Sequence, residues 1–587
     1  MKILFLHPND QLLNGWWVEY RWDRIIDLGR SGWASSRKAA VHFNCPITPI
    51  DSLRNEFKEI RDVGSLLRAG VGRLVDRFGL DWWELTAILA HSQVENLILL
   101  KKLAATIEPG AEVHITRPGF SASALELLLG SQVQVISRAN DSRKRGLGHY
   151  VRVARKFPLR QLTQIFWDKT DAGYQWRGRV STRAKPHKKP VVLLPTAYVN
   201  VSRTGIGYAK AIPELDFLLV ATRPSGWLSD VPSNVGRAWL RSYASFDVRG
   251  RRDEFQHLME CWKGLRAKLE AEVIFKTFAD LGGFDDFPAK VAQGLEIRDA
   301  WRNVFDREPV QAVLCADDSN PYTHLPLLLA EKRGLQTVAC HHGALDGRYM
   351  LKQTHADALL AKGAMEEDYL VRVCGVPREK VEVGAPPGGE RVKANRAMNS
   401  NSPIVFFSEV YEVSGNGRTV EFYRDVLPSL ADLAIQHGRE LIVKLHPAES
   451  LVERTKFALE VLSENQRKVT QVVAGRLDPT FLSSIWFGVT VLSSVAVECV
   501  VLNIPCFLCR WLEFWPYGYI DQFLRFGVGI GLDRPEDMAR IPELLAAYRP
   551  SAALAETCSK PIVRQRLQEL LASSERAAPV AVTEGRT

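Results

Sequence analysis

The chain has 587 residues, which is too long for one hydrophobic core, so two or three domains are expected. Its composition, 46% hydrophobic and 24% charged, excludes extensive disorder and is typical of a globular protein. Only the tail from Ser573 lacks apolar periodicity, and no stretch is long and apolar enough for a membrane span. The net charge of +9 is concentrated in one segment, described below.

The first block predicts a Rossmann-like region over residues 1–180. It opens on the apolar strand Ile3–Leu6, with no cleavable signal sequence, and continues in the strand Val113–Thr116. A helix over Ser123–Leu129 and a strand over Val133–Ile136 then complete a βαβ unit. The pairs Trp16-Trp17 and Trp82-Trp83 are expected to be core residues, with stacking on sugar rings as the alternative.

Residues 143–189 carry most of the positive charge. They contain fourteen Lys and Arg residues against two acids, interleaved with aromatic and aliphatic side chains. This pattern predicts an amphipathic surface that contacts anionic lipid headgroups, which makes peripheral membrane contact possible. A solvated linker remains an alternative, and no motif supports a nucleic-acid partner.

Two further blocks predict doubly wound α/β domains over residues 190–395 and 403–575. Apolar strands alternate with helices in both, as expected for parallel sheets buried on two faces. The strands are expected at Val191–Leu194, Phe217–Ala221, Ala312–Cys315, Thr337–Cys340, Ile404–Phe407, Glu440–Leu445, Val469–Val473, Gly488–Leu492 and Cys506–Cys509, the last of the series. The loop Gly205–Tyr208 is a candidate flexible acceptor loop.

The sequence Lys444-Leu445-His446-Pro447 ends one of these strands. Side chains alternate along a strand, so Lys444 and His446 are predicted to point to the same side. Pro447 stops the strand and fixes His446 at its carboxyl edge. A cation and an imidazole placed together suit a phosphate or a carboxylate, although a His-Pro pair alone is often structural.

Ser493 and Ser494 end a later strand and begin a helix. Free backbone N–H groups and hydroxyls at that point favour a phosphate. Glu498 follows one turn later on the face of Ser494, where its carboxylate could accept hydrogen bonds from ribose. A simply capped helix is the alternative.

Together these motifs resemble those of GT-B glycosyltransferases. The resemblance is to the bacterial capsule and surface-polysaccharide group, which includes Kdo-transferases and sialyltransferases and, more distantly, CDP-glycerol polymerases. A matching element is His341-His342-Gly343, and the likeness covers about residues 310–510. It implies that His446, Ser493 and Ser494 contact the nucleotide phosphate and that Glu498 contacts ribose or sugar. Lys444 and Gly343 are further candidate residues for donor binding.

A transferase that inverts its sugar needs a base for the acceptor hydroxyl and groups that neutralise the leaving phosphate. The candidate bases are Asp317, Asp318, His342 and Glu409. Asp317 or Asp318 is slightly favoured, because sialyltransferases have two acids followed by Gly, although Ser319 stands at that place here. Both acids could instead cap the helix over 322–333. The resemblance implies no metal.

The expected fold is therefore α/β and GT-B-like, with two facing doubly wound domains and an extra N-terminal α/β region. The expected function is transfer of a sugar from a nucleotide sugar, CMP- or UDP-linked, to a surface polysaccharide or lipid-linked glycan. The alternatives are a sugar-nucleotide epimerase, a CDP-alcohol phosphotransferase or a non-catalytic polysaccharide-assembly protein. The expected location is the cytoplasm, at the inner face of the membrane, with no cofactor other than the donor.

Overall fold

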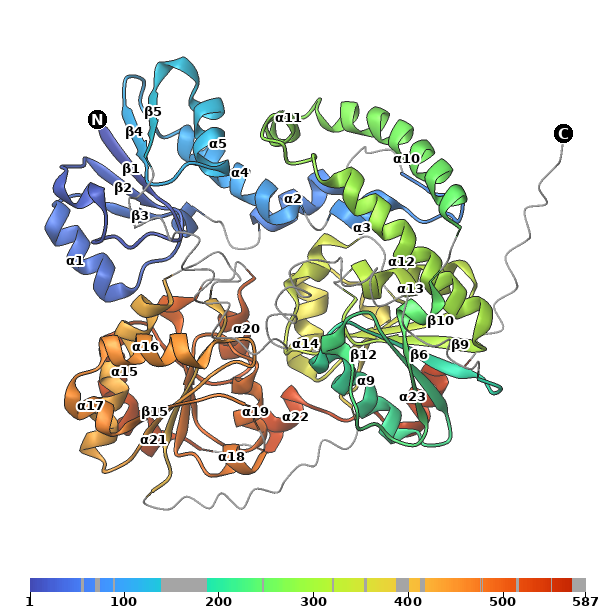
Figure 1. The fold of residues 1–587 in the computed structure, drawn as a ribbon. Helices are drawn as coiled ribbons and strands as arrows, with labels where there is room; N and C mark the ends of the chain where they lie inside the picture. Colours follow the sequence, from blue (N-terminus) through green and yellow to red (C-terminus); the bar gives the residue numbers. More distant parts are fainter. Residues whose placement is uncertain are drawn as a thin grey trace.

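A computed structural model describes residues 1–53, 58–68, 74–87, 90–138, 187–244, 247–318, 321–352, 356–386, 401–411, 418–475, 477, 479–513, 517–549 and 552–572. Three parallel sheets organise these residues (Figure 1). The basic segment 143–189 lies outside the described residues except for its last three, so its predicted lipid contact stays a prediction. No described helix is long and apolar enough to cross a bilayer.

The N-terminal sheet has five strands in the order β3-β2-β1-β4-β5. The predicted βαβ unit is confirmed, with its helix beginning three residues earlier than expected. Strands β2 and β3 were not predicted; they are short and their apolar residues form no long run. The bounds are β1 Lys2–Leu6, β2 Arg24–Asp27, β3 Ile47–Pro49, β4 Glu112–Ile115, β5 Gln134–Ser137, α1 Trp33–Phe43, α2 Lys58–Arg68, α3 Trp82–Ala87, α4 His91–Ala104 and α5 Phe120–Leu129.

The central sheet has seven strands in the order β12-β11-β10-β9-β6-β7-β8. All six residues of β6 are buried, as expected for a strand covered by helices on both faces. The strands are β6 Val191–Thr196, β7 Asp216–Ala221, β8 Val235–Trp239, β9 Val310–Cys315, β10 Gln336–Cys340, β11 Ala358–Ala361 and β12 Val381–Val383. The helices are α9 Val199–Ala211, α10 Val248–Leu269, α11 Val273–Asp280, α12 Phe287–Arg307, α13 Pro321–Lys332 and α14 Ala364–Asp368.

The third sheet has six strands in the order β15-β14-β13-β16-β17-β18. The series does not close at Cys506–Cys509 as predicted, because β18 pairs in parallel with that strand. The strands are β13 Ile404–Phe407, β14 Leu441–Lys444, β15 Thr470–Val473, β16 Phe487–Thr490, β17 Cys506–Cys509 and β18 Ile530–Leu532. The helices are α15 Thr419–Gln436, α16 Leu451–Val461, α17 Glu464–Lys468, α18 Pro479–Ser483, α19 Val495–Val501, α20 Tyr519–Arg525, α21 Ile541–Ala547, α22 Ala552–Cys558 and α23 Arg564–Leu571.

All three sheets share one winding pattern, in which the first strand lies inside and the strand order reverses beside it. The reversals fall between β1 and β4, between β6 and β9, and between β13 and β16. In open parallel sheets ligands bind at such switch points, outside the carboxyl ends of the strands. The predicted α/β class, with doubly wound parallel sheets and an additional N-terminal α/β region, is confirmed.

Two local predictions have different outcomes. The segment Gly205–Tyr208 is not a loop but part of α9, where Gly205 and Tyr208 are buried. Gly207 lies so close to Pro386 that an added Cβ would approach its Cβ to 3.0 Å, so the glycine serves packing. The core prediction for the tryptophan pairs is confirmed for Trp17, Trp82 and Trp83, which are nearly inaccessible to solvent.

The N-terminal helices join the central domain in one hydrophobic core. The Trp83 ring lies 5.9 Å from that of Trp262 on α10, and α3 and α4 contact helices of the central domain. The chain also returns to the central sheet at its other end. Leu567 and Leu571 of α23 pack in the core of β6, β7, β9 and β10, so the central sheet is covered by both early and late segments (Figure 1).

The N-terminal and third domains meet through α1 and α15. The Arg418 guanidinium, fully buried, lies 2.7 Å from both carboxylate oxygens of Asp27. At the N-terminus of α1, the backbone N–H of Gly32 donates to Glu421 at 2.9 Å, and that of Ala34 donates to Asp425 at 3.0 Å. The carboxylates thus satisfy helix N–H groups that no intrahelical acceptor can reach.

Stability of this contact is expected to depend on pH. Burial raises the pKa of Glu421 to about 7, although Arg418 opposes the shift. A carboxyl whose folded pKa lies above its unfolded value stabilises the fold at low pH, and that stabilisation is lost as pH rises from about 4.5 to about 7. We expect Glu421→Gln to gain stability relative to the natural chain between pH 5 and pH 8, by up to about 3 kcal/mol.

Urea unfolding at the two pH values measures this difference. The amide oxygen of Gln can still accept from Gly32, so the variant removes the charge and keeps the hydrogen bond. Glu464→Gln on the exposed start of α17 is the control and should show no such change. An equal pH response in Glu421→Gln and the natural chain would contradict the prediction.

Candidate functional site

Several charged and imidazole side chains lie at the carboxyl edge of the central sheet. Asp317 and Asp318 follow β9 at the switch point, and both are buried. His341 and His342 follow β10, the next strand, and Lys362 follows β11. Because the strands are parallel and adjacent, these groups meet at one edge, and Gly343 follows His342 there.

Asp318 is held in a buried ion pair. The Lys352 ammonium lies 2.5 Å from its Oδ1, and both side chains are almost inaccessible to solvent. Burial acts to raise the pKa of Asp318, but Lys352 and His324 outweigh it, so the net shift is downward. A buried carboxylate in such a pair is a poor proton acceptor, so the structure gives Asp318 an organising role.

The His341-His342-Gly343 turn is fixed by Lys362. Its ammonium donates to the carbonyl of His341 at 2.6 Å and to the carbonyl of Gly343. Glycine is required at 343, because an added Cβ would lie 2.8 Å from Cε1 of the His341 ring. Gly343 therefore allows the turn to pack tightly against the His341 ring, and this turn contains His342.

Burial lowers the pKa of both imidazoles. For His341 the neighbouring His342 adds to this effect, whereas for His342 the nearby carboxylate of Asp317 opposes it. Asp346, which accepts from the Arg348 guanidinium at 2.9 Å, has a pKa far below its usual value despite its burial. The edge thus presents neutral imidazoles beside a cation, Arg348, whose side chain is about one third exposed.

Several buried polar atoms at this edge lack a partner among the described residues. They are Nδ1 of His341, Nδ1 of His342 and Oδ2 of Asp318. Buried polar groups are nearly always hydrogen-bonded, so a group of unsatisfied ones indicates a place where a ligand or water completes the set. This is the polar signature of a site, at the switch point where the fold predicts one.

A second polar group lies at the carboxyl edge of the third sheet. Glu449 is central to it: its carboxylate accepts from Ser408 at 2.9 Å, from Arg454 at 2.7 Å and from the backbone N–H of His446 at 2.8 Å. Glu409 lies at the switch point and accepts from Thr490 at 3.0 Å. Burial raises the pKa of Glu409 to about 7.

Lys444 and His446 make different hydrogen bonds. Partial burial, with a further contribution from the Lys444 cation, lowers the pKa of His446, so the two side chains lie near one another. Lys444 is buried, and its ammonium donates to the carbonyl of Gly475 at 2.6 Å, so it ties two loops together. His446 is exposed, and its Nδ1 accepts from the backbone N–H of Ala448 at 3.1 Å. A neutral His446 therefore carries its proton on Nε2, which is a donor suited to a phosphate oxygen.

Ser493, Ser494 and Glu498 lie where they were predicted, at the start and first turn of α19. Ser493 Oγ accepts from the backbone N–H of Val495 at 3.3 Å, whereas Ser494 makes no side-chain cap. Ser494 and Glu498 are exposed. They follow β16 across the switch point from Glu409, so β13 separates them from the His446 turn.

The two edges meet through the loops that follow β10 and β17. The backbone N–H of Gly347 donates to the Tyr519 hydroxyl at 2.9 Å, and the Tyr369 hydroxyl donates to the carbonyl of Tyr517 at 2.8 Å. Helix α22 contacts both α14 and α19, so it borders both edges. Carboxyl ends of the central and third sheets thus lie opposite one another, with α14, α19, α20 and α22 at the junction (Figure 1).

Sequence reasoning missed several organising residues. Lys352 and Lys362 act on partners that lie 34 and 21 residues earlier in the sequence, whereas Arg348 pairs with Asp346, only two residues away. Glu449 stands three residues after His446, and that short spacing was the one available signal for its role. Within the described ranges, no group of three His, Cys, Asp or Glu side chains is arranged to hold a metal ion.

Comparisons with known proteins give only distant similarities. No family model matches the chain, and no curated protein does. Among solved structures, S. aureus MnaA with UDP is 12% identical (65% of this chain, 94% of that chain, TM-score 0.39). The Methanocaldococcus jannaschii UDP-GlcNAc 2-epimerase with UDP-GlcNAc and UDP is 13% identical (65% and 99%, TM-score 0.39). Acinetobacter baumannii MurG is 12% identical (65% and 99%, TM-score 0.38).

Proposed function

We propose that this protein is a metal-independent, inverting glycosyltransferase that uses a nucleotide sugar. One observation carries the proposal: two switch-point edges lie opposite one another, one with buried, unsatisfied imidazoles and the other with exposed phosphate donors. The first edge contains His342 beside Asp317, and the second contains His446 with Ser493 and Ser494. An acceptor hydroxyl needs a base such as a neutral imidazole, and the phosphate of a nucleotide sugar needs hydrogen-bond donors.

His342 is the proposed general base. Its lowered pKa keeps the imidazole neutral at physiological pH, so it can take a proton, and Asp317 stabilises the imidazolium that results. The acceptor oxygen would then form a bond to the anomeric carbon as the bond from that carbon to the phosphate oxygen breaks. The nucleotide leaves with the electron pair, and the proton stays on His342.

The third domain is the proposed donor side. Nε2–H of His446 and the hydroxyls of Ser493 and Ser494 would bind the leaving phosphate, and Glu498 the ribose or sugar. Lys444 has a supporting role because its ammonium is bound by backbone carbonyls. The proposed acceptor is a surface polysaccharide or lipid-linked glycan, reached at the inner face of the membrane, and the donor is CMP- or UDP-linked.

A thermal-shift series with CMP, CDP, UDP and GDP tests this proposal. We expect at least one nucleotide to raise Tm, because a ligand at 100 times its Kd adds about 2.7 kcal/mol of stability. His446→Ala and Ser494→Ala should weaken that shift, whereas His437→Ala, on the far end of α15, should not. Absence of any nucleotide-dependent shift would overturn the proposal. Conversion of a UDP-sugar in the absence of an acceptor would instead indicate a sugar-nucleotide epimerase.

A further inference from the structure

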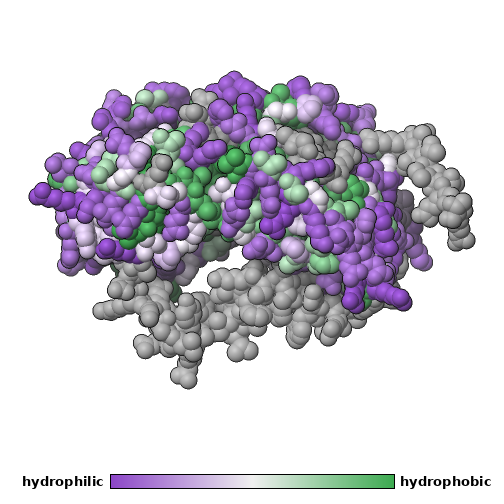
Figure 2. All heavy atoms as spheres, turned by 90° about the horizontal axis from the view of Figure 1, so that it is seen from above, coloured by the Kyte–Doolittle hydropathy of each residue, from purple (hydrophilic) through white to green (hydrophobic). Residues whose placement is uncertain are grey.

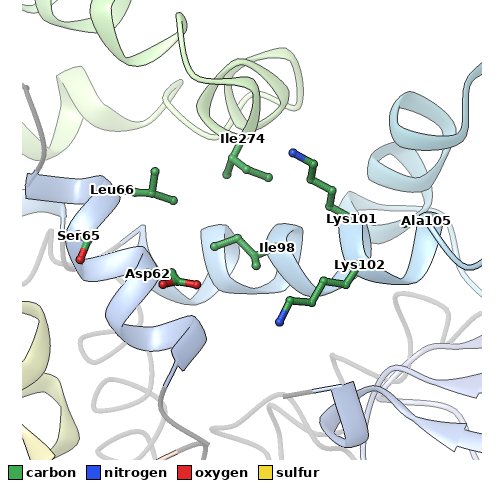
Figure 3. A pocket seen from close by; sticks show the side chains of 8 residues that line it. All are labelled: Asp62, Ser65, Leu66, Ile98, Lys101, Lys102, Ala105 and Ile274. Carbon is green, nitrogen blue, oxygen red and sulfur yellow. The ribbon is translucent and has the colours of Figure 1, made fainter. Parts of the chain in front are cut away.

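A pocket of about 630 Å³ lies outside the candidate site, between α2, α4 and α11 (Figure 3). Its lining residues are Asp62, Ser65, Leu66, Ile98, Lys101, Lys102, Ala105 and Ile274. The α4 residues recur at positions i, i+3, i+4 and i+7, which is one face of a helix. The opposite face of α4 is buried in the core through Leu99, Leu100 and Leu103.

The floor of the pocket is apolar. Leu66 from α2, Ile98 from α4 and Ile274 from α11 point toward its centre (Figure 3). Each of them is only partly buried in the folded chain, so they hold apolar surface that no other part of the described chain covers. Figure 2 shows the face on which α4 and α11 lie, where hydrophobic residues gather amid largely hydrophilic ones. The volume is in the range of small-molecule sites.

The rim is positively charged. Lys101 and Lys102 leave α4 in different directions, so ammonium groups flank the pocket on two sides (Figure 3). The one acid among its lining residues, Asp62, pairs with Lys58 at 2.7 Å. Within the described residues, no carboxylate forms an ion pair with Lys101. An apolar floor with a cationic rim is complementary to a chain that bears an anionic head.

The pocket is one helix away from the candidate site. Ile60, on another face of α2, packs with Leu345, Met350 and Leu351, which surround Arg348 in the sequence. Arg61 donates to the carbonyl of Val373 at 3.3 Å, so α2 is anchored to the central domain beside the site. Helix α2 therefore lies between a molecule seated in the pocket and the loop that carries Arg348.

We propose that this pocket binds the apolar chain of a single anionic amphiphile, a lipid phosphate. We assign the amphiphile as the lipid that carries the sugar acceptor, and this assignment rests on the proposed function. Binding of the amphiphile to the pocket does not depend on that assignment. The phosphate lies at the lysine rim, and the chain lies on Leu66, Ile98 and Ile274.

Calorimetry with dodecyl phosphate, below its micelle concentration and without nucleotide, tests the site in the full chain. We expect dodecyl phosphate to bind at least tenfold more tightly than dodecyl maltoside. The double variant Lys101→Ala, Lys102→Ala should lose that preference, and Ile98→Asp should lose binding of both. Lys276→Ala is the matched control, because this exposed lysine of α11 pairs with Asp280 outside the pocket.

Equal binding of the two amphiphiles, or binding that survives both pocket variants, would overturn the proposal. So would flotation on vesicles of phosphatidylglycerol that is insensitive to these substitutions, since it would indicate a membrane surface in place of one amphiphile. Circular dichroism of each variant separates lost binding from lost folding. If dodecyl phosphate binds but no nucleotide raises Tm, the pocket proposal stands and the glycosyltransferase proposal fails. If a nucleotide raises Tm but dodecyl phosphate does not bind, only the glycosyltransferase proposal stands.

Discussion

His342→Gln is expected to lower kcat by about 10²–10⁴-fold, the usual contribution of a general base. Gln is similar in size and keeps a hydrogen-bonding group, so the turn held by Lys362 should persist. Affinity for the nucleotide should change little, because the proposed donor contacts lie in the third domain. Steady-state kinetics together with nucleotide titration measure the two effects separately. A kcat within threefold of the natural enzyme would exclude His342 as the base.

The pH profile distinguishes a base from a structural residue. Burial lowers the pKa of His342, so the acid limb of kcat/KM should lie below the ordinary histidine value of 6.5. Asp317 raises that pKa, so Asp317→Asn should move the acid limb to still lower pH while it reduces kcat. An acid limb that stays in place in Asp317→Asn would mean that another group titrates.

Arg298→Met is expected to cause the largest loss of stability. Arg298 is fully buried, and its guanidinium lies 2.7 Å from Asp76, Glu254 and Asp299, which come from three separate segments. Removing the cation leaves Asp76 without its ion-pair partner and leaves Glu254 and Asp299 with only the longer pairs to Arg77 at 3.4 Å and Arg251 at 3.6 Å. Breaking a buried ion pair in this way costs about 3–5 kcal/mol. Urea unfolding, followed by tryptophan fluorescence because Trp82 donates to Asp76, measures the loss.

Lys263→Met is the matched control for this variant. Lys263 forms an exposed i,i+3 pair with Glu260 on α10, and exposed pairs contribute at most about 1 kcal/mol. A loss in Arg298→Met no greater than that of the control would show that the carboxylates are neutralised in another way. Burial acts to lower the pKa of the Arg298 guanidinium, but Glu254, Asp299 and Asp76 raise it by more, so Arg298 keeps its positive charge at any working pH.

The apolar strands were predictable because a parallel sheet covered on both faces leaves a continuous hydrophobic run. Val191–Leu194 and Ile404–Phe407 are such runs, and both lie inside their sheets. Six strands escaped prediction: β2, β3, β8, β11, β12 and β18. All are short, and Arg237 and Gly531 interrupt the apolar residues of β8 and β18. These segments form strands because they pair with strands that are distant in the sequence. Local hydrophobic periodicity does not reveal such pairing.

The candidate site was predictable at the level of strand ends, and less so at the level of side chains. Alternation along β14 predicts that Lys444 and His446 share a side, but it does not predict that the carbonyl of Gly475 binds the Lys444 ammonium. Asp318 looked equivalent to Asp317 until Lys352, 34 residues later, distinguished the two. Such pairings depend on how three strands assemble.

The double crossing between the central and third sheets has a mechanical consequence. Ala385 lies where the chain leaves the central sheet for the third domain, and Lys560 and Ile562 lie where it returns. Ala385 is hydrogen-bonded to both, so the two connections between the domains run side by side. The N-terminal domain spans the other side, held to the third domain by Arg418 and Asp27 and to the central domain by α3 and α4. The N-terminal domain therefore bridges the other two domains, and a change in their relative orientation would require one of these attachments to break.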